Sequence, residues 1–300
     1  MDYRTYTTVH FDTPSEVGLE LISSEVGFLL LLRASLVLLL PYLANTIGDI
    51  MTKITVNRKD FLSFLSGFTK GLTDLRMDCA GSRITVEVGF ASYYLRKYFL
   101  TAQIEEEGTI HMADTDKVLK FFKASKEDNI TLKQNASVKP LHITSGGNKL
   151  QLPSTDDIES ASKSVVIRNM LMKSQQMGWS SFGKTTLSAH GTTDTKDLIS
   201  LSGMRSLVAD DTDFKLRIHC GEEEMGIVAG KAMSGKLFTS LAISDTDGPP
   251  TTVESLFSNA LPKCLQYLDE GDARVHMGKS SPVIFEQDNT LLLIIDVGDD

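Results

Sequence analysis

The feature that most constrains the fold of this 300-residue chain is an internal duplication. The sequence Leu-Ser-Gly at 65–67 returns at 201–203, and Pro-Leu-His-Ile at 140–143 returns as Pro-Val-Ile-Phe at 282–285. The two spacings nearly agree, which is typical of tandem structural units that differ only in loop length. We therefore expect two like modules in the chain from residue 51 onward.

Each copy combines few helices with many short strands. In the first copy, apolar residues at helical spacing from Phe61 to Leu72 predict a helix, and the turn residues Gly81-Ser82 predict a hairpin. In the second copy, Thr193 or Asp194 suits a helix N-cap, and Pro262 suits the first turn of another short helix. Each copy is thus predicted to run strand, helix, three strands, helix, three strands.

This element order predicts an α+β fold in which each module has an antiparallel sheet with two helices on one face. Such a module leaves sheet edges open, and open edges pair with other chains unless they are blocked. Two like modules with free edges can close head-to-tail into a ring.

Residues 1–50 do not share this pattern. The stretch 27–44 is strongly apolar but contains Arg33 and Pro41, and the start of the chain is unlike a signal peptide. We expect Met51 to be the natural start and the preceding residues to be an upstream extension, with a packed extra helix or a membrane anchor as alternatives. The expected domains are an N-terminal extension 1–50, module 1 at 51–153, an interdomain linker 154–183 and module 2 at 184–300.

The charges are unevenly distributed. The chain has 30 basic and 39 acidic residues, a net charge of -9, which is not the composition of a simple cationic nucleic-acid coat protein. The helix expected near 117–123 nevertheless places Lys117, Lys120 and Lys123 on one face, and Lys263 takes the equivalent position in the second copy. A solvated helix face is the alternative interpretation, but cationic helices on an acidic body suit a sequence-independent grip on phosphates. The candidate DNA-binding residues are Arg58, Lys59, Lys70, Lys117, Lys120, Lys123, Lys196, Arg205 and Lys263.

Together these features resemble the DNA polymerase sliding clamp (processivity factor) family over residues 51–297. The segments that carry the resemblance are DTDKVLKFFKASKEDNITLKQ with PLHITSGGNKLQLPSTDD, and LPKCLQYLDEGDARVHMGKSSPVIFEQDNTLLLIID. The resemblance implies a two-module chain of the phage-like type that forms a homotrimeric ring around double-stranded DNA without reading its bases.

The resemblance also implies partners. They are a replicative DNA polymerase, which the ring tethers, and a clamp loader, in the cytoplasm of the host cell if the chain is phage-encoded. Partners of the family dock short hydrophobic peptides between the modules, and the linker contains a helix-like stretch at 165–177. That stretch is either part of a peptide pocket or an ordinary packed helix. The candidate partner-peptide residues are Val165, Ile167, Leu171, Pro282 and Val297.

One motif argues for an enzyme instead. Residues 178–185, GWSSFGKT, match the phosphate-loop pattern GxxxxGK[ST], and the hydrophobic run that ends at Asp296 resembles a strand that carries a magnesium-binding aspartate. The loop needs a strand before it and a helix after it, whereas TTLSAHG after Lys184 alternates like a strand. A P-loop NTPase is therefore the alternative function, beside a protein-interaction scaffold that does not bind DNA.

The sequence contains no motif for a metal site or for nucleophilic catalysis. The three cysteines are far apart without a CxxC pair, and the six histidines are scattered without a matched nucleophile. We therefore expect no catalytic residues, no metal site and no cofactor.

Overall fold

The computed structural model describes residues 51–68, 72, 74–135, 139–153, 159–204, 213–220, 224–229, 237–247 and 251–297. They all belong to one compact unit, Asp49–Asp300. The expected N-terminal extension, residues 1–50, lies outside the described residues. Among the described helices, none is both long and apolar enough to cross a membrane.

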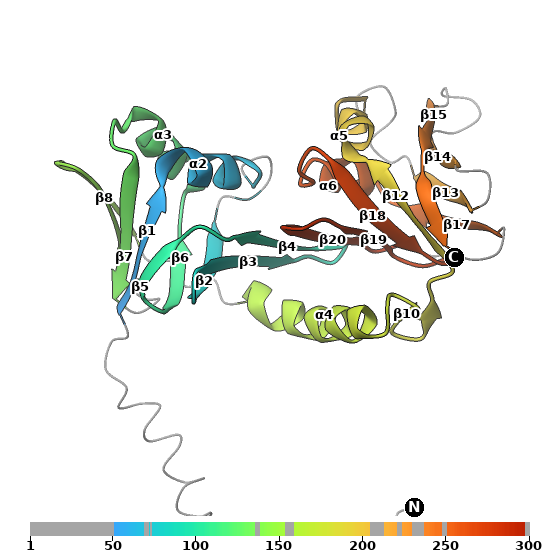
Figure 1. Cartoon of the computed structure of the whole chain (residues 1–300), viewed down its shortest axis with the longest axis horizontal. Helices are drawn as coiled ribbons and strands as arrows, with labels where there is room; N and C mark the ends of the chain where they lie inside the picture. The colour runs from blue at the N-terminus through green and yellow to red at the C-terminus, as the bar shows by residue number, and fades with distance from the viewer. Residues whose placement is uncertain are drawn as a thin grey trace, which may run out of the picture. The chain divides into compact units, whose positions relative to one another are not determined.

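The first repeat, called module 1, consists of a strand, a helix, five strands, a second helix and three further strands (Figure 1). Its elements are β1 (Met51–Asn57), α2 (Arg58–Ser66), β2 (Leu75–Ala80), β3 (Arg83–Gly89), β4 (Tyr93–Phe99), β5 (Gln103–Glu106), β6 (Gly108–Met112), α3 (Thr115–Ala124), β7 (Asn129–Asn135), β8 (Leu141–Ser145) and β9 (Asn148–Leu152).

The second repeat, module 2, has the same order of elements. They are β12 (Ala189–Asp194), α5 (Thr195–Met204), β13 (Phe214–Cys220), β14 (Glu224–Ala229), β15 (Leu237–Ala242), β16 (Ser244–Asp247), β17 (Thr251–Phe257), α6 (Ala260–Leu265), β18 (Asp272–Met277), β19 (Val283–Glu286) and β20 (Thr290–Ile294). Between the modules lies the arm, formed by helix α4 (Glu159–Gln176) and the hairpin β10 (Ser181–Phe182) and β11 (Thr185–Thr186).

The duplication is thus real at the level of elements, but one detail of the predicted order is wrong. Five strands, not three, separate the two helices of each module. The strand expected near 99–104 is the end of β4, a loop and the start of β5, whereas Pro262 lies in the first turn of α6 as expected, at its third residue. The antiparallel sheets with two helices per module are as expected.

The strand pairing repeats from one module to the other. In module 1, β7 pairs with β1 and β8, β8 pairs with β9, and β3 pairs with β2 and β4; in module 2, β18, β19 and β14 make the equivalent pairs. One junction joins the modules: β4 pairs antiparallel with β20, with Leu95 opposite Leu292. This junction creates a nine-stranded sheet with the order β16-β12-β18-β19-β20-β4-β3-β2-β6.

Polar side chains set the helix starts. The side chain of Asn57 accepts hydrogen bonds from the backbone N–H groups of Lys59 and Asp60 at the start of α2. Asp114 accepts one from the N–H of Lys117 at the start of α3, and Asp194 accepts one from the N–H of Lys196 at the start of α5. These caps satisfy N–H groups that have no partner within the helix.

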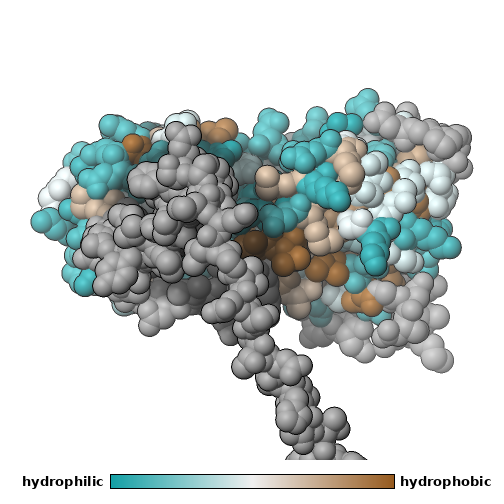
Figure 2. Space-filling view, turned by 90° about the horizontal axis from the view of Figure 1, so that it is seen from below, coloured by the Kyte–Doolittle hydropathy of each residue, from teal (hydrophilic) through white to brown (hydrophobic). Residues whose placement is uncertain are grey.

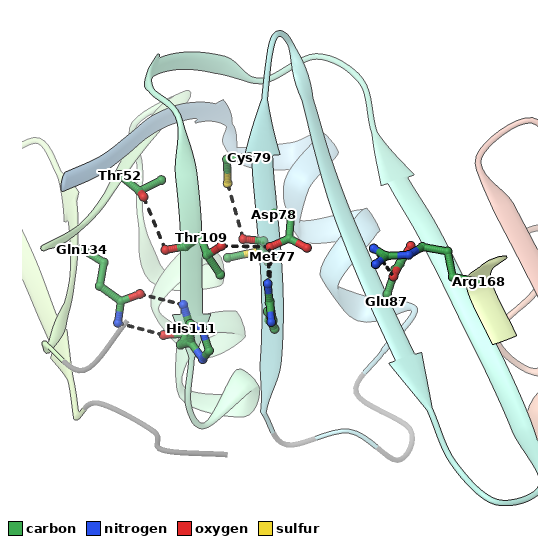
Figure 3. A network of polar contacts seen from close by, with 10 residues as sticks. Thr52, Met77, Asp78, Cys79, Glu87, Thr109, His111, Gln134 and Arg168 are labelled. Atoms are coloured by element: carbon green, nitrogen blue, oxygen red, sulfur yellow. Dashed lines mark hydrogen bonds and ion pairs between the residues drawn. The ribbon is translucent and has the colours of Figure 1, made fainter. Parts of the chain in front are cut away.

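One large apolar core runs through both modules and includes the buried faces of α2, α3, α5 and α6. Gln134 of module 1 is fully buried, and its polar side chain is paired, as Figure 3 shows. Its amide accepts from the backbone N–H of His111 at 2.6 Å and donates to the carbonyl of the same residue at 3.3 Å. This exchange ties β7 to β6, and burial lowers the pKa of His111.

Candidate nucleic-acid interface

Four helices lie on one side of the sheets, and the arm lies on the other (Figure 1). Helix α2 packs against α3, and α5 packs against α6. Their inner faces belong to the large core, so their outer faces are left for solvent or a ligand. This side of the protein therefore carries the predicted DNA-facing surface.

Helix α3 has the two faces that its sequence predicts. Val118, Leu119 and Phe122 are buried, while Lys120 and Lys123 are exposed. Apolar residues three and four positions apart fall on one side of a helix, so the intervening lysines must point outward. The amphipathic interpretation of this helix is confirmed.

The predicted DNA-binding residues fall into three groups. The exposed group is Lys59, Lys117, Lys120, Lys123, Lys196 and Lys263. Arg58 is half-buried, and its Nε donates to the carbonyl of Glu127 at 3.0 Å, so it positions the turn before β7. Lys70 and Arg205 lie outside the described residues.

The exposed lysines outweigh the acids on the same helices. Against the six lysines stand three exposed aspartates within α2, α3 and α5, namely Asp60, Asp116 and Asp197, which leaves a surplus of three positive charges (six minus three) on the described helices. Lys117 is partly neutralised because its Nζ forms an ion pair with Asp114. On a chain of net charge -9, the described helices themselves carry a local surplus of positive charge, and Lys120 and Lys123 are its clearest contributors.

The arm covers the opposite side of the sheet junction. Leu171 and Trp179 are buried against Tyr94 of β4 and Leu293 of β20 in a second apolar cluster, separate from the large core. Figure 2, which looks onto the side where the arm lies in Figure 1, shows hydrophobic residues gathered on that surface. The arm therefore rests on the outer face of the strands that join the two modules.

The predicted partner-peptide residues are divided by this packing. Val165 is 39% exposed and Val297 is 43% exposed, so both are accessible. Ile167 packs against the second cluster, and Leu171 and Pro282 are buried. The helix-like stretch of the linker is thus a packed helix with an accessible outer surface.

Polar contacts anchor the arm at two places. In the middle of α4, Arg168 forms an ion pair with Glu87 of β3 at 3.3 Å (Figure 3). Near its end, the carboxylate of Glu286 accepts hydrogen bonds from Trp179 Nε1 at 2.8 Å and from Gln175 Nε2 at 3.0 Å. Trp179 also stacks on His276, with ring centroids 4.9 Å apart.

The pKa of Glu286 lies below its ordinary value of 4.5. The main cause is His276, whose Nε2 is 3.5 Å from the carboxylate, and Trp179 adds to it, while burial acts in the opposite direction. At 3.5 Å the contact with His276 is an ion-pair distance rather than a well-formed hydrogen bond. A carboxyl group whose pKa is lowered by folding stabilises the folded state above its unfolded pKa, and this stabilisation is lost as pH falls through the folded pKa.

Acidification should therefore loosen the end of the arm. As pH falls below 4.5 and Glu286 is protonated, we expect the emission of Trp179, the single tryptophan, to shift to longer wavelength before the far-ultraviolet circular dichroism changes. In Glu286→Gln, which keeps an acceptor oxygen but cannot titrate, this separate step should be missing. An identical fluorescence step in both proteins would contradict the role of Glu286.

The phosphate-loop match does not have the structure that nucleotide binding requires. Residues 181–186 form the two-stranded hairpin of the arm, with Phe182 opposite Thr185, and Gly183 in the left-handed region at the turn. Lys184 lies exposed in this turn. A strand, β11, follows it directly in place of a helix, and β20 is antiparallel to both of its neighbours. A phosphate loop needs a helix N-terminus aimed at the phosphates, so the sequence match is not supported as a nucleotide site.

Within the described residues there is no group of three or more potential metal-ligating side chains. The three cysteines are free and buried, and burial raises the pKa of Cys79 and of Cys264 to about 12. A buried neutral thiol is a poor nucleophile.

No protein-family model and no curated protein sequence matches the chain. Solved structures do match. A. fulgidus PCNA with the C-terminal region of FEN-1 bound is 13% identical, with a TM-score of 0.59 over 83% of this chain and 99% of that chain. PCNA from Entamoeba histolytica is 14% identical, with a TM-score of 0.59 over 85% and 100%. The Helicobacter pylori β clamp bound to a DNA ligase peptide is 13% identical, with a TM-score of 0.57 over 83% and 67%.

These similarities define the fold as that of the DNA sliding clamps. The chain spans the whole length of the PCNA chains and about two thirds of the β clamp chains. At identities of 10–14% the likeness establishes the fold and leaves the activity to be argued from the surfaces of this chain.

Proposed function

We propose that this protein is a sliding clamp, a non-catalytic processivity factor that encircles duplex DNA and tethers a replicative polymerase. The observation that carries the proposal is the module junction. Strand β20 of module 2 pairs with β4 of module 1, while β9, the equivalent of β20, and β15, the equivalent of β4, end their sheets without a partner among the described strands.

The two free edge strands are the equivalents of the two strands that pair at the module junction. Because β9 and β15 occupy the places of β20 and β4 in their own modules, the contact that joins the modules can join β9 of one chain to β15 of the next. Repetition of one contact head-to-tail generates a closed ring when the rotation per module divides the circle. The chain matches two thirds of a β clamp chain and all of a PCNA chain, which favours rings of three copies of this two-module chain.

DNA would pass through the ring along the helical side. The surplus of lysines on α2, α3, α5 and α6 supplies phosphate contacts that carry no base information. Individual contacts of this kind are weak in salt, but a closed ring needs little affinity because it cannot leave the DNA sideways. We place a polymerase and a clamp loader among its partners, and a phage-type replication system in the host cytoplasm as its setting.

Partner segments would dock on the arm side. The exposed apolar residues of α4, among them Val165, Val166 and Met172, offer a surface for short hydrophobic peptides, and Val297 is a further exposed apolar residue. A DNA ligase peptide is bound to the Helicobacter pylori β clamp, and the C-terminal region of FEN-1 is bound to A. fulgidus PCNA, which supports this assignment.

A threading experiment tests the proposal on the full chain without a loader. A linear duplex is fixed to a bead at one end, the protein is allowed to thread from the free end, and that end is then blocked with a bound antibody. We expect protein to stay on the DNA through a high-salt wash that screens phosphate contacts, and to leave when a restriction enzyme cuts the duplex. Equal loss from blocked and unblocked DNA would contradict encirclement and favour a scaffold that does not hold DNA.

The exposed lysines of the four helices, called the lysine face, are tested in the same assay. Lys120→Glu combined with Lys123→Glu should reduce threading at low salt by about tenfold, because each chain in a ring brings repulsion to the phosphates. The matched control combines Lys184→Glu with Lys279→Glu, two exposed lysines outside the four helices. It carries the same charge change and should thread like the original chain. Equal effects of the two double variants would remove the helices from the proposed interface.

A further inference from the structure

A row of side chains crosses the nine-stranded sheet on the side of the arm. The strand register places Thr192 opposite Arg274, Arg274 opposite Glu286, Glu286 opposite Leu291, and Leu291 opposite Arg96. Directly opposed residues in a sheet project from the same face. The face is that of the arm, because Glu286 binds Gln175 of α4.

This row forms the floor of a cavity of about 700 Å³. Tyr98 and Gln175 stand beside the row, and the walls come from the loop 269–272 and the turn 287–290. The volume is in the range of small-molecule and peptide side-chain pockets. The cavity lies next to the second apolar cluster but does not include the exposed apolar residues of α4.

Arg96 is the unusual residue of the cavity. It is only 9% exposed, and its Nε has no hydrogen-bond acceptor among the described residues. Its guanidinium carbon lies 5.3 Å from the centroid of the Tyr98 ring. The opposed carboxylate of Glu87 on β3 is engaged by Arg168 instead (Figure 3), and no described carboxylate lies within ion-pair distance of Arg96.

A buried cation without a counter-charge is costly. An arginine is always protonated and cannot escape this cost by losing a proton, as a lysine can. Its planar group with fixed donors matches the two oxygens of a carboxylate or a phosphate, and carboxylates are the anionic side chains of unmodified proteins. The side chain of Arg96 is therefore prepared for an external carboxylate.

The rim of the cavity has the opposite character. Glu270, Asp272 and Asp288 are exposed and line it. Together with Asp269, which also lines the cavity and pairs with Lys97, these carboxylates repel polyanions, so nucleic acid and free phosphate are poor candidates. A peptide that places a carboxylate at the floor and a basic side chain at the rim meets a charge of opposite sign at both positions.

We propose that this cavity is a docking site for a short segment of a partner protein, in which an Asp or Glu carboxylate binds Arg96 while a neighbouring Lys or Arg faces the acidic rim. The site is separate from the lysine face and from the exposed apolar surface of α4. It adds an electrostatic selection to partner binding, because a purely hydrophobic peptide leaves Arg96 unpaired.

The experiment selects ligands for the full chain from displayed random short peptides. Selected peptides are synthesised with their acidic residue intact and, in a second version, with the matching amide. Both are titrated into ¹⁵N-labelled protein while the arginine Nε–H signals are followed, and the signal that Arg96→Gln removes identifies Arg96.

Acid-containing peptides should be enriched, and they should shift the Arg96 signal in a saturable manner. Binding should weaken at least about tenfold for the amide version or for Arg96→Gln, as expected for loss of a charge-assisted hydrogen bond. Arg83→Gln is the matched control: Arg83 is exposed, and its guanidinium lies 4.8 Å from the same Tyr98 ring. That variant should bind normally.

Three results would overturn the proposal: no enrichment of acidic residues, equal binding of the amide peptide, or the same shift of the Arg96 signal with inorganic phosphate alone. The amide comparison uses the unaltered protein, so it stands even if Arg96→Gln does not fold. The test involves neither DNA nor ring formation. Its failure leaves the clamp proposal standing, and a failure of encirclement leaves this docking site standing.

Discussion

A Leu150→Asp substitution is expected to reduce the proposed trimer to single chains. Leu150 lies on β9, the free edge of the five-stranded sheet, and it is half-buried within its own module. In the equivalent place on β20, Leu292 is opposite Leu95 of β4 and is fully buried. If β9 pairs with β15 of a second chain in the same way, Leu150 becomes buried at that contact.

A carboxylate at this position would be buried without a partner in the ring but solvated in the separate chain. An uncompensated buried charge destabilises a contact by roughly 3 kcal/mol or more, a weakening of more than about a hundredfold for each of the contacts that close the ring. Light scattering after size exclusion should therefore change from about three times the chain mass of 32.9 kDa to the chain mass itself.

The neighbouring lysine supplies the control. Lys149→Asp also introduces a carboxylate into β9, but Lys149 is exposed and is equivalent to Leu291, whose side chain belongs to the arm side of the sheet. It should leave the mass unchanged. Both variants must show the circular dichroism of the original chain. A folded Leu150→Asp protein that keeps the full mass would exclude β9 as the ring contact.

The sequence predicted the duplication and the amphipathic helices because their signals are local. The alternation of buried and solvent-facing residues survives in β1 and in α3, where one face meets the core and the other meets water. Strand β4 has no such signal. Five of its seven residues, including Arg96 and Lys97, are buried. Helices cover one face of the strand, and the arm and the loop 269–272 approach the other face.

The candidate site was predictable to the same extent. Lysines on helix faces were found by helical spacing, and six of the nine predicted residues are exposed on the described helices. The role of Arg96 was not predictable, because the sequence YYLRKYF contains an ordinary-looking pair of cations. Only the register that sets Arg96 opposite Leu291, far away in the chain, reveals that the guanidinium is buried without a counter-ion.

The neighbouring cation provides the second large effect, on stability. Lys97 of β4 is 3% exposed at its side chain, and its Nζ lies 2.7 Å from Asp269 Oδ1 in the loop after α6. Asp269 also accepts a hydrogen bond from Thr290 at the start of β20, at 2.8 Å. The ion pair therefore joins module 1 to module 2 beside the strand junction.

Asp269→Ala is expected to destabilise the chain by about 2 kcal/mol. Loss of one partner from a buried pair costs roughly 3–5 kcal/mol, but Asp269 is 54% exposed, so water admitted at its place reduces the cost. Urea unfolding at one fixed protein concentration should show a lower midpoint with an unchanged slope.

The effect of a second substitution on stability distinguishes an unpaired buried charge from the simple loss of a favourable contact. Lys97→Met keeps an apolar chain over the Phe68 ring, which Lys97 Nζ approaches to 5.9 Å, and it removes the cation. Added to Asp269→Ala, it should recover most of the lost stability, because replacement of both partners by apolar groups is often nearly neutral. Glu254→Gln, at a partly exposed ion-pair site with Lys215 and Arg217, should change stability by less than about 1 kcal/mol. If Lys97→Met instead adds its own loss to that of Asp269→Ala, the two residues act independently and the ion pair does not hold the junction.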